Sequence, residues 1–267
     1  MDNSSAIIDN NDLLEKRNSH PRDKYIQFYE ENHRYTIHGS SEGYISVTTL
    51  IHTFFPHFDS NTIAKKVYNK HNKNPDSEYY NMTVNDIIEK WEDNRNSAAK
   101  AGTEMHKCIE LYFNNILRMD NHSKEFNMFL FGFLRDYPSL VPYRTEWCVY
   151  DESIKLSGSI DMTFLNPDGT LDICDWKRSR EIKKENKWES GFGILSNLPH
   201  ANYHHYSLQL NIYKRILETN YDKKIRDMYL IVLHPDNDKY LRYDIPDLKE
   251  YVDKIWGTIG GTSCQSA

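Results

Sequence analysis

The sequence predicts an α/β (α+β) protein, with a central mixed β-sheet flanked by helices and a helical lobe in the N-terminal half. Helical patterns dominate residues 58–137, whereas strands and helices alternate after residue 140. Of the 267 residues, 39% are hydrophobic and 13% aromatic, which is enough to build a substantial core. We therefore expect one domain over residues 23–257, with the helical lobe at about 58–137 and the core that carries the sheet at about 141–257.

The chain opens with a polar segment and short strands. Residues 1–22 are polar and aperiodic, which predicts a disordered arm. β-Branched and aromatic residues then predict strands at Lys24–Tyr29, His33–Ile37 and Tyr44–Thr48.

Four helices are expected next. Ser60 and Thr83 suit the N-caps of the first two, because a hydroxyl oxygen accepts the free N–H groups of a first turn. A third helix covers Ser97–Leu117, and a fourth covers Ser123–Asp136 and ends before a proline. Gly102 inside the third helix indicates close approach of another group, since glycine costs about 1 kcal/mol in a helix interior.

Strands and two further helices complete the chain. Tyr143–Tyr150 alternates as a strand does, and a tight hairpin follows it. Residues 181–200 form an irregular, basic connection. The remaining expected elements are an amphipathic helix at Tyr203–Thr219, strands at Met228–His234 and Tyr240–Tyr243, a helix at Asp247–Trp256 and a flexible tail at 258–267.

Charge and cysteine content exclude several classes of protein. A net charge of −6 argues against coating nucleic acid by bulk electrostatics, although a local basic groove stays compatible with it. No stretch is apolar enough to span a bilayer and no signal-peptide pattern opens the chain, so we expect an intracellular protein without a membrane partner. The four cysteines are scattered, which predicts a reducing compartment and neither a zinc knuckle nor an iron–sulfur cluster.

The hairpin carries the strongest functional pattern. Asn166-Pro-Asp-Gly169 is a strong turn sequence, and a three-residue loop there sets the register of both strands. In that register Asp161 lies directly across from Asp175. Lys177 lies two residues beyond Asp175, so it projects from the same face.

Two facing carboxylates and a lysine suit phosphodiester hydrolysis. Two unit charges at 4 Å repel by roughly 4 kcal/mol at an effective dielectric near 20. A divalent cation such as Mg²⁺ turns that repulsion into attraction, and the lysine can hold a phosphate or a water molecule. The alternative interpretation is an ordinary exposed hairpin with a few surface charges.

Two other elements offer metal ligands. His106 and Glu110 lie one turn apart on a helix and share a face, and imidazole is a common metal ligand. Glu146, on the strand before the hairpin, could join the site or orient a ligand, although Arg144 on the same strand could neutralise it instead. Both glutamates are candidates for a second metal or for a supporting contact.

A basic segment follows the candidate lysine. It contains cations that suit a nucleic-acid backbone, with aromatic Trp188 and Phe192 after them, a combination found where single strands bind. On the helix at 203–219, Gln209 and Tyr213 lie one turn apart and can hydrogen-bond a strand or a nucleic-acid backbone. The expected DNA-binding cations are Arg178, Arg180, Lys183 and Lys184.

These motifs follow a familiar order. The chain contains Ile45-Ser-Val-Thr48, then His106 in a Gly-Thr-x-x-His helix, Gly158-Ser-Ile-Asp161, Asp175-Trp-Lys177 and Gln209-x-x-x-Tyr213. The order resembles the RecB-like branch of the PD-(D/E)XK nuclease superfamily. The Ser-Val-Thr element is similar to that of the mitochondrial genome maintenance exonuclease group. The sequence departs from the pattern in having Ile160 where a proline often stands and Asp175 in place of glutamate.

The resemblance implies a restriction-endonuclease-like core and a Mg²⁺- or Mn²⁺-dependent DNA nuclease. It implies that Lys177 positions the attacking water. It further implies that Gln209 and Tyr213 shape the site and touch DNA, and that Ser46 and Thr48 hold phosphate. The metal ligands it implies are His106, Asp161, Asp175 and the backbone carbonyl of Trp176.

We therefore expect a metal-dependent exonuclease that acts on single-stranded DNA ends in replication, repair or recombination, with replication or repair proteins as further candidate partners. Two alternatives stay open. One is an endonuclease specific for branched or flapped DNA, and the other is a non-catalytic nucleic-acid-binding subunit of a nuclease–helicase complex.

Overall fold

The structure, a computed structural model, describes residues 13–117 and 123–263 of the chain. It divides into two compact units. The helical unit is His57–Glu104, and the sheet unit joins Met1–Pro56 to Met105–Ala267. All the candidate site residues lie in the sheet unit.

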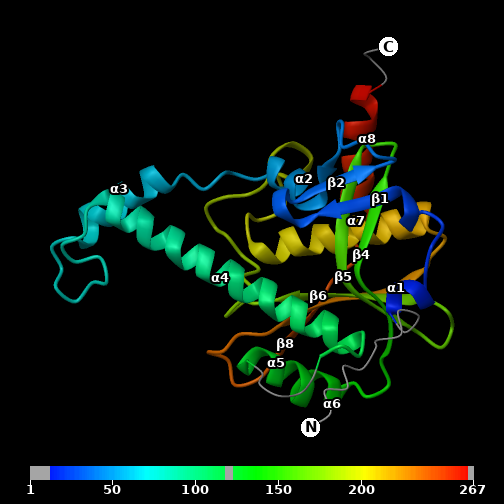
Figure 1. Ribbon diagram of the computed structural model, residues 1–267. Coiled ribbons are helices and arrows are strands. Elements are labelled where there is room, and N and C mark those ends of the chain that lie inside the picture. Colours follow the sequence, from blue (N-terminus) through cyan, green and yellow to red (C-terminus); the bar gives the residue numbers. More distant parts are fainter. Residues whose placement is uncertain (1–12, 118–122, 264–267) are drawn as a thin grey trace, which may run out of the picture. The chain divides into compact units, whose positions relative to one another are not determined.

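A six-stranded mixed sheet forms the centre of the sheet unit, which confirms the predicted fold class (Figure 1). The strand order is β3-β5-β6-β7-β8, and β4 pairs with β5 outside this path. A separate antiparallel pair consists of β1 (Ile26–Tyr29) and β2 (Arg34–Ile37). The strands of the large sheet are β3 (Ile45–Ser46), β4 (Val141–Asp151), β5 (Leu156–Leu165), β6 (Leu171–Lys177), β7 (Ile225–Val232) and β8 (Leu241–Asp244).

Strand β5 pairs with three other strands, and its two edges are occupied differently. Along one edge it pairs antiparallel with β4 from Leu156 to Leu165. Along the other edge β3 pairs with its beginning, at Leu156 and Ser157, and β6 pairs with its end, from Met162 onward. In the described ladders, residues 158–161 therefore have no strand partner on that edge. This interruption of the sheet positions the candidate site.

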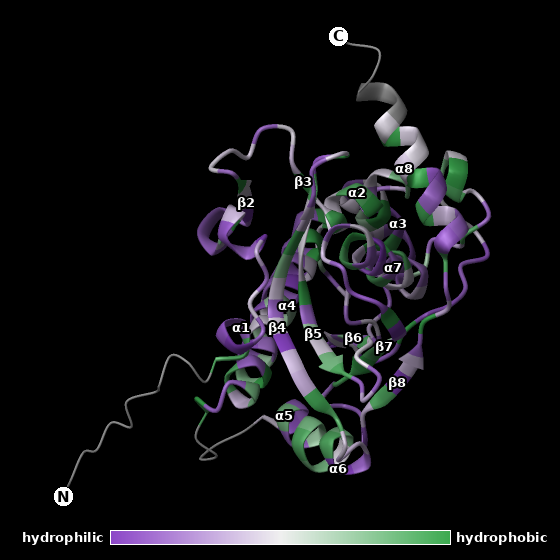
Figure 2. Ribbon diagram, turned by 90° about the vertical axis from the view of Figure 1, so that its right-hand side faces the viewer, coloured by the Kyte–Doolittle hydropathy of each residue, from purple (hydrophilic) through white to green (hydrophobic). Residues whose placement is uncertain are grey.

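Helices cover both faces of the sheet. One core lies beneath α2 (Val47–Thr53), α7 (Asn202–Asn220) and α8 (Lys249–Ser263), and it contains the strand residues Leu156, Ile173 and Leu230. Figure 2 shows α2 and α7 together on one side of β5. Strand β6 is buried along nearly its whole length, as expected for a strand that is covered on both faces.

The second core lies on the other face. It is built by α1 (Leu14–Arg17), the end of α4 (Val84–Phe113), α5 (Lys124–Met128), a π-helical turn at Phe129–Phe133 and α6 (Leu134–Asp136). Met105, Ile109 and Phe113 of α4 pack with Met162 and Phe164 of β5. The expected helical lobe at 58–137 therefore ends earlier, because residues from Met105 onward bury their apolar side chains against the sheet.

Parts of the predicted N-terminal arm and C-terminal tail are ordered. Residues 13–22 are structured, because Leu14 is buried and its N–H donates to Asn114 Oδ1 at 2.9 Å. Arg22 lies over the Tyr150 ring at 4.0 Å. Helix α8 continues to Ser263, past its predicted end at Trp256, and its Ile259 packs against the core. Residues 1–12 and 264–267 lie outside the described part of the chain.

Several predicted boundaries also move. Val47 and Thr48 begin α2 instead of ending a strand, because the Ser46 side chain accepts the Thr49 N–H and caps that helix. The helices expected near Thr83 and at 97–117 are one helix, α4. A Cβ added to Gly102 would meet no atom within 4 Å, so no other part of the described chain approaches Gly102 closely.

The helical unit consists of residues His57–Glu104. It contains α3 (Ser60–His71), whose N-cap is Asp59 and not the expected Ser60. Its residues Ala64 and Ile87 are fully buried. The Trp91 indole N–H donates to the Tyr79 hydroxyl at 3.2 Å.

Gly158 lies in the interrupted edge of β5 and makes a close contact. A Cβ added there would lie 2.7 Å from the Tyr213 hydroxyl and 2.8 Å from its ring. Tyr213 is 3% exposed and cannot swing away. We predict that Gly158→Ala lowers the free energy of unfolding by about 1–3 kcal/mol through overpacking, measured by urea denaturation.

The matched control is Gly102→Ala. Its added methyl group meets nothing and removes the helix penalty of glycine, so stability should hold or rise. An unchanged midpoint for Gly158→Ala would contradict this packing.

Candidate functional site

The hairpin has the predicted register. Asn166 N–H donates to Thr170 O at 2.8 Å, and Gly169 adopts a positive φ of 84°. The β5–β6 ladder runs from Leu165↔Leu171 to Met162↔Cys174, one pair short of Asp161 and Asp175. The strands separate at that point.

At the point of separation a side chain replaces the backbone ladder. The Trp176 N–H donates to Asp161 Oδ2 at 2.9 Å instead of to a backbone carbonyl. Buried N–H groups need a partner, so this contact fixes the Asp161 carboxylate at the end of the ladder. The carboxylate is thereby positioned in the interruption of the sheet.

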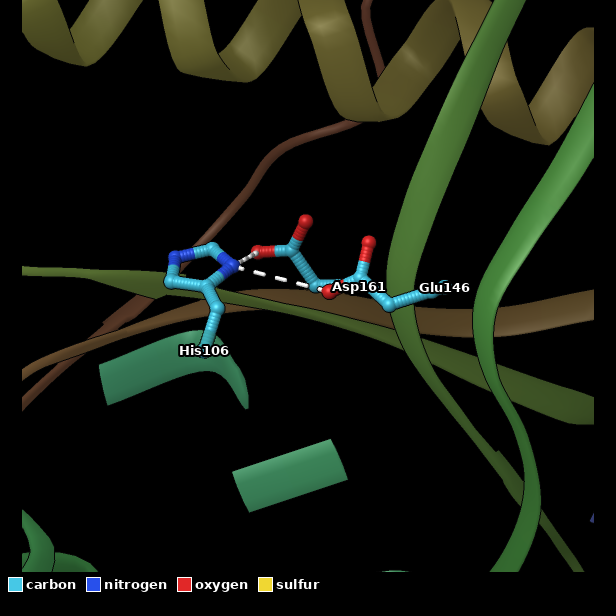
Figure 3. A group of neighbouring side chains, drawn as sticks. All are labelled: His106, Glu146 and Asp161. Carbon is cyan, nitrogen blue, oxygen red and sulfur yellow. Dashed lines mark ion pairs between the residues drawn. The ribbon is translucent and has the colours of Figure 1, made fainter. Parts of the chain in front are cut away.

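Three side chains converge there to form a candidate metal-ligand cluster of His106, Glu146 and Asp161 (Figure 3). One ligand atom from each lies within 4.8 Å of the others. His106 Nδ1 lies 3.7 Å from Glu146 Oε1 and 3.6 Å from Asp161 Oδ2. The three residues come from α4, β4 and β5, so only the folded chain brings them together.

Hydrogen bonds orient each member of the cluster. His106 Nε2 lies 2.9 Å from Trp176 O, so that nitrogen donates to the carbonyl and Nδ1 faces the two carboxylates. Ser159 Oγ donates to Glu146 Oε2 at 3.1 Å. This pattern, an imidazole fixed through its second nitrogen, is typical of metal-ligating histidines.

Glu146 has a strained backbone. Its φ is +43° in the middle of a strand, which is uncommon for any residue other than glycine. The neighbouring pairs Thr145↔Met162 and Trp147↔Ile160 continue on either side, so the strain is confined to the residue beside Asp161. A strained backbone conformation persists only where the surrounding structure enforces it, and such residues cluster at functional sites.

The charges in the cluster balance one another. Burial alone would lower the pKa of His106, but the carboxylates of Asp161 and Glu146 raise it to about 9. Burial raises the pKa of Asp161, whereas His106 and Lys177 act in the opposite direction. Two carboxylates and one imidazole form a donor set that suits a divalent cation, since carboxylate oxygens bind Mg²⁺ and Mn²⁺ and imidazole binds several transition metals.

Asp175 and Lys177 form a buried ion pair beside the cluster. Lys177 Nζ lies 2.7 Å from Asp175 Oδ2, and the carboxylate is 4% exposed. Burial and the charge of Asp161 raise the pKa of Asp175 to about 6. Burial lowers the pKa of Lys177, but Asp175 and Asp161 outweigh it and raise that pKa, so the ammonium stays charged. The Tyr206 ring also faces Nζ, at 4.6 Å.

The expected metal ligands are therefore only partly the ones that converge. His106 and Asp161 belong to the cluster, and Glu146 takes the third position. Asp175 instead contacts Lys177. The Trp176 carbonyl accepts from His106.

Two other expectations for this part of the site differ from the structure. Glu110 turns away from the cluster and pairs with Lys107 Nζ at 2.8 Å. Arg144 does not neutralise Glu146, because it is buried against Asp23 at 2.7 Å.

Gln209 and Tyr213 are buried, at 8% and 3% exposure. Tyr213 packs over Gly158 and accepts from Gln209 Nε2 at 3.4 Å. They shape the interrupted edge, and a direct contact with DNA would require surfaces that they do not expose. Ser46 and Thr48 are more accessible, and Ser46 Oγ lies 2.9 Å from Thr48 Oγ1.

The four expected DNA-binding cations differ in their surroundings. Arg178 lies in a structural ion pair, with Nε donating to Glu125 Oε1 at 2.7 Å and side-chain exposures of 18% and 9%. It therefore links β6 to α5 and is not available to DNA. The exposed cations are Arg180, Lys183 and Lys184.

Sequence reasoning gave too little weight to three residues of the site. Glu146 was only a candidate, since a positive φ in a strand cannot be inferred from residue types. Tyr206 was not selected at all, although its position one turn before Gln209-x-x-x-Tyr213 offered a usable hint. Ser159 stands two residues before Asp161 and shares its side of β5, which the period of a strand could have shown.

No family model matches the chain, and no curated protein matches it. A crystal structure of SSO0001 shares 14% identity over 85% of this chain and 79% of that one, with a TM-score of 0.34. A structure from Eubacterium rectale described as a "putative exonuclease" shares 10% identity over 90% of this chain and 85% of that one, also with a TM-score of 0.34. The functional proposal therefore depends on the geometry of the site itself.

Within the described residues, none of the helices combines the length and the hydropathy that crossing a bilayer requires.

We predict that the cluster binds Mn²⁺ and that Asp161→Asn or Glu146→Gln weakens this binding at least tenfold, because each change removes a charged ligand. Isothermal titration calorimetry measures the effect. Glu110→Gln is the matched control, since Glu110 lies outside the cluster and should leave the affinity unchanged. If Glu110→Gln weakened Mn²⁺ binding as much as Glu146→Gln, the assignment of the cluster would be contradicted.

We also predict that Arg178→Met lowers the free energy of unfolding by about 3 kcal/mol, because it leaves Glu125 buried without its partner. Lys183→Met is the comparison, since Lys183 and its partner Glu181 are both well exposed. Chemical denaturation of the two variants would show whether Arg178 has the structural role described.

Proposed function

We propose that this chain is a divalent-metal-dependent nuclease that hydrolyses phosphodiester bonds, acting as an exonuclease on single-stranded DNA ends. One observation carries the proposal. A His–Glu–Asp cluster lies beside a buried Asp175–Lys177 pair, where the sheet is interrupted. The order of sequence motifs, which resembles the RecB-like nucleases, supports the same reaction.

The donor set suits Mg²⁺ or Mn²⁺, held by His106, Glu146 and Asp161. A cation bound there would neutralise charge on the substrate phosphate and lower the pKa of a water molecule. Lys177 supplies a second positive charge on the other side of Asp161, where it can orient the water and stabilise negative charge that develops at the phosphate.

The remaining residues keep that lysine in place. Asp175 holds the ammonium at 2.7 Å, and the Tyr206 ring limits its movement on the other side. Because Asp175 is almost completely buried, its carboxylate is directed to the lysine and not to solvent. We expect it to position Lys177, and to come within reach of a cation if the lysine moves toward the phosphate.

Loss of Lys177 tests the proposal directly. We predict that Lys177→Met or Asp161→Asn reduces cleavage of end-labelled linear single-stranded DNA by about 10²–10³-fold, as for loss of one transition-state contact. EDTA should abolish cleavage, and added Mg²⁺ or Mn²⁺ should restore it. Glu110→Gln is the control, and it should retain activity because Glu110 lies outside the cluster.

Circular single-stranded DNA distinguishes the alternatives. An exonuclease leaves it intact, whereas the structure-specific endonuclease would cut it when it contains a hairpin or flap. A protein that binds Mn²⁺ and DNA but cleaves neither substrate would instead be the non-catalytic subunit. Full activity in Lys177→Met would refute the site assignment.

A further inference from the structure

The connection between β6 and α7 presents an aromatic residue to solvent. Trp188 is 92% exposed and Phe192 is 54% exposed. A packed tryptophan buries roughly 150–250 Å², so an indole left almost wholly in water is unusual without something to cover it. Neither residue belongs to the candidate metal-ligand cluster or to the Asp175–Lys177 pair.

The exposed Trp188 lies in a turn that is fixed by hydrogen bonds. Asn186 Oδ1 accepts the N–H groups of Trp188 and Glu189 at 3.0 and 3.2 Å, while its Nδ2 donates to His200 O at 2.9 Å. His200 N–H in turn donates to Glu189 O at 2.9 Å. Phe192 N–H donates to Phe54 O at 2.7 Å. The turn is therefore fixed on both sides of Trp188, with the indole directed outward.

The same connection is attached near the candidate site. Lys183 N–H donates to Asn202 Oδ1 at 2.7 Å, in the first turn of α7. One turn later on α7, Tyr206 faces Lys177 Nζ. Four residues of helix advance by roughly 6 Å, so the connection and the catalytic lysine meet the same end of α7. In Figure 1 the connection runs beside the yellow helix α7.

The charges around Trp188 favour a polyanion. Four exposed cations lie on the connection, against three exposed glutamates, Glu181, Glu185 and Glu189. Of these, Glu189 lies 3.2 Å from His200 Nδ1. Lys184 Nζ rests 4.7 Å from the Tyr203 ring, which holds that cation against the first turn of α7. The exposed cations are Arg180, Lys183, Lys184 and Lys187.

An exposed indole beside cations matches single-stranded nucleic acid better than duplex. Single-stranded bases have free faces that stack on aromatic side chains, while cations follow the backbone. In a duplex those faces are stacked on neighbouring base pairs and are not available. A protein partner would cover the indole as well, but it would leave the cations without a matching charge.

We propose that Trp188 stacks against a base of single-stranded DNA, and that the cations of the same connection hold its phosphates on the way to the candidate metal-ligand cluster. The identity of the polymer rests on the proposed nuclease function. The binding itself requires no cleavage.

The test is binding of a fluorescein-labelled oligothymidylate of about 20 nucleotides, followed by anisotropy in EDTA, where hydrolysis does not occur. Trp188→Ala should weaken binding about tenfold, within the range for losing one stacked base. Trp188→Tyr should keep the affinity within about threefold. A blunt duplex of similar length should bind the wild type and Trp188→Ala almost equally.

Phe131→Ala is the matched control, because Phe131 is also an exposed aromatic residue, at 60%, but lies on the π-helical turn Phe129–Phe133. It should leave the affinity unchanged. Thermal unfolding of Trp188→Ala should match the wild type, since the side chain makes little packing contact.

The two proposals fail separately. Trp188-dependent binding by a protein that cleaves no DNA would overturn only the nuclease proposal. Cleavage of single-stranded DNA by a protein whose binding is the same with Trp188 or alanine would overturn only the stacking proposal. Equal weakening by Phe131→Ala and Trp188→Ala would also overturn it.

Discussion

The site depends on one feature of the sheet: β5 pairs with β4 along one edge, but its other edge is divided between β3 and β6. Strand β3 takes the beginning of one edge and β6 takes the end, so residues 158–161 lie open between them. The Asp161 carboxylate satisfies the Trp176 N–H where the ladder stops. A continuous ladder would leave no room for a carboxylate to face into the sheet, and the three ligand residues would not meet.

The buried polar groups around this interruption support one another. The Trp176 N–H donates to Asp161, and the Trp176 carbonyl accepts from His106, so the backbone of one β6 residue orients two members of the cluster. Gly158 lets Tyr213 of α7 close over the open edge. Buried polar groups are costly unless each has a partner, and here the partners are the functional groups themselves.

The acidic and basic groups of the site compensate one another's charge. Glu146, Asp161 and Asp175 bring three acidic groups together, and His106 and Lys177 oppose them with two basic groups. Without such compensation, burial would favour the neutral form of each acid. A cation placed among the acids would take over part of the role of the imidazolium and the ammonium, which makes the arrangement suitable for a metal-dependent reaction.

The sequence by itself determined the fold class, the hairpin register and the shared face of Asp175 and Lys177. These follow from local causes. One is the period of strands and helices, and the other is the turn Asn166-Pro-Asp-Gly169, whose length fixes which residues of the two adjacent strands face each other. It also indicated His106 and Asp161, through motifs on single elements. Only the tertiary structure decided the third member of the cluster, because Glu146 reaches it through a positive φ that residue type does not reveal. Likewise the sequence does not distinguish Arg178 from Lys183, since both are basic residues of one segment. In the structure Arg178 is buried against Glu125, whereas Lys183 is exposed. These outcomes depend on contacts between segments that are far apart in the sequence, and local sequence patterns do not show which segments will meet.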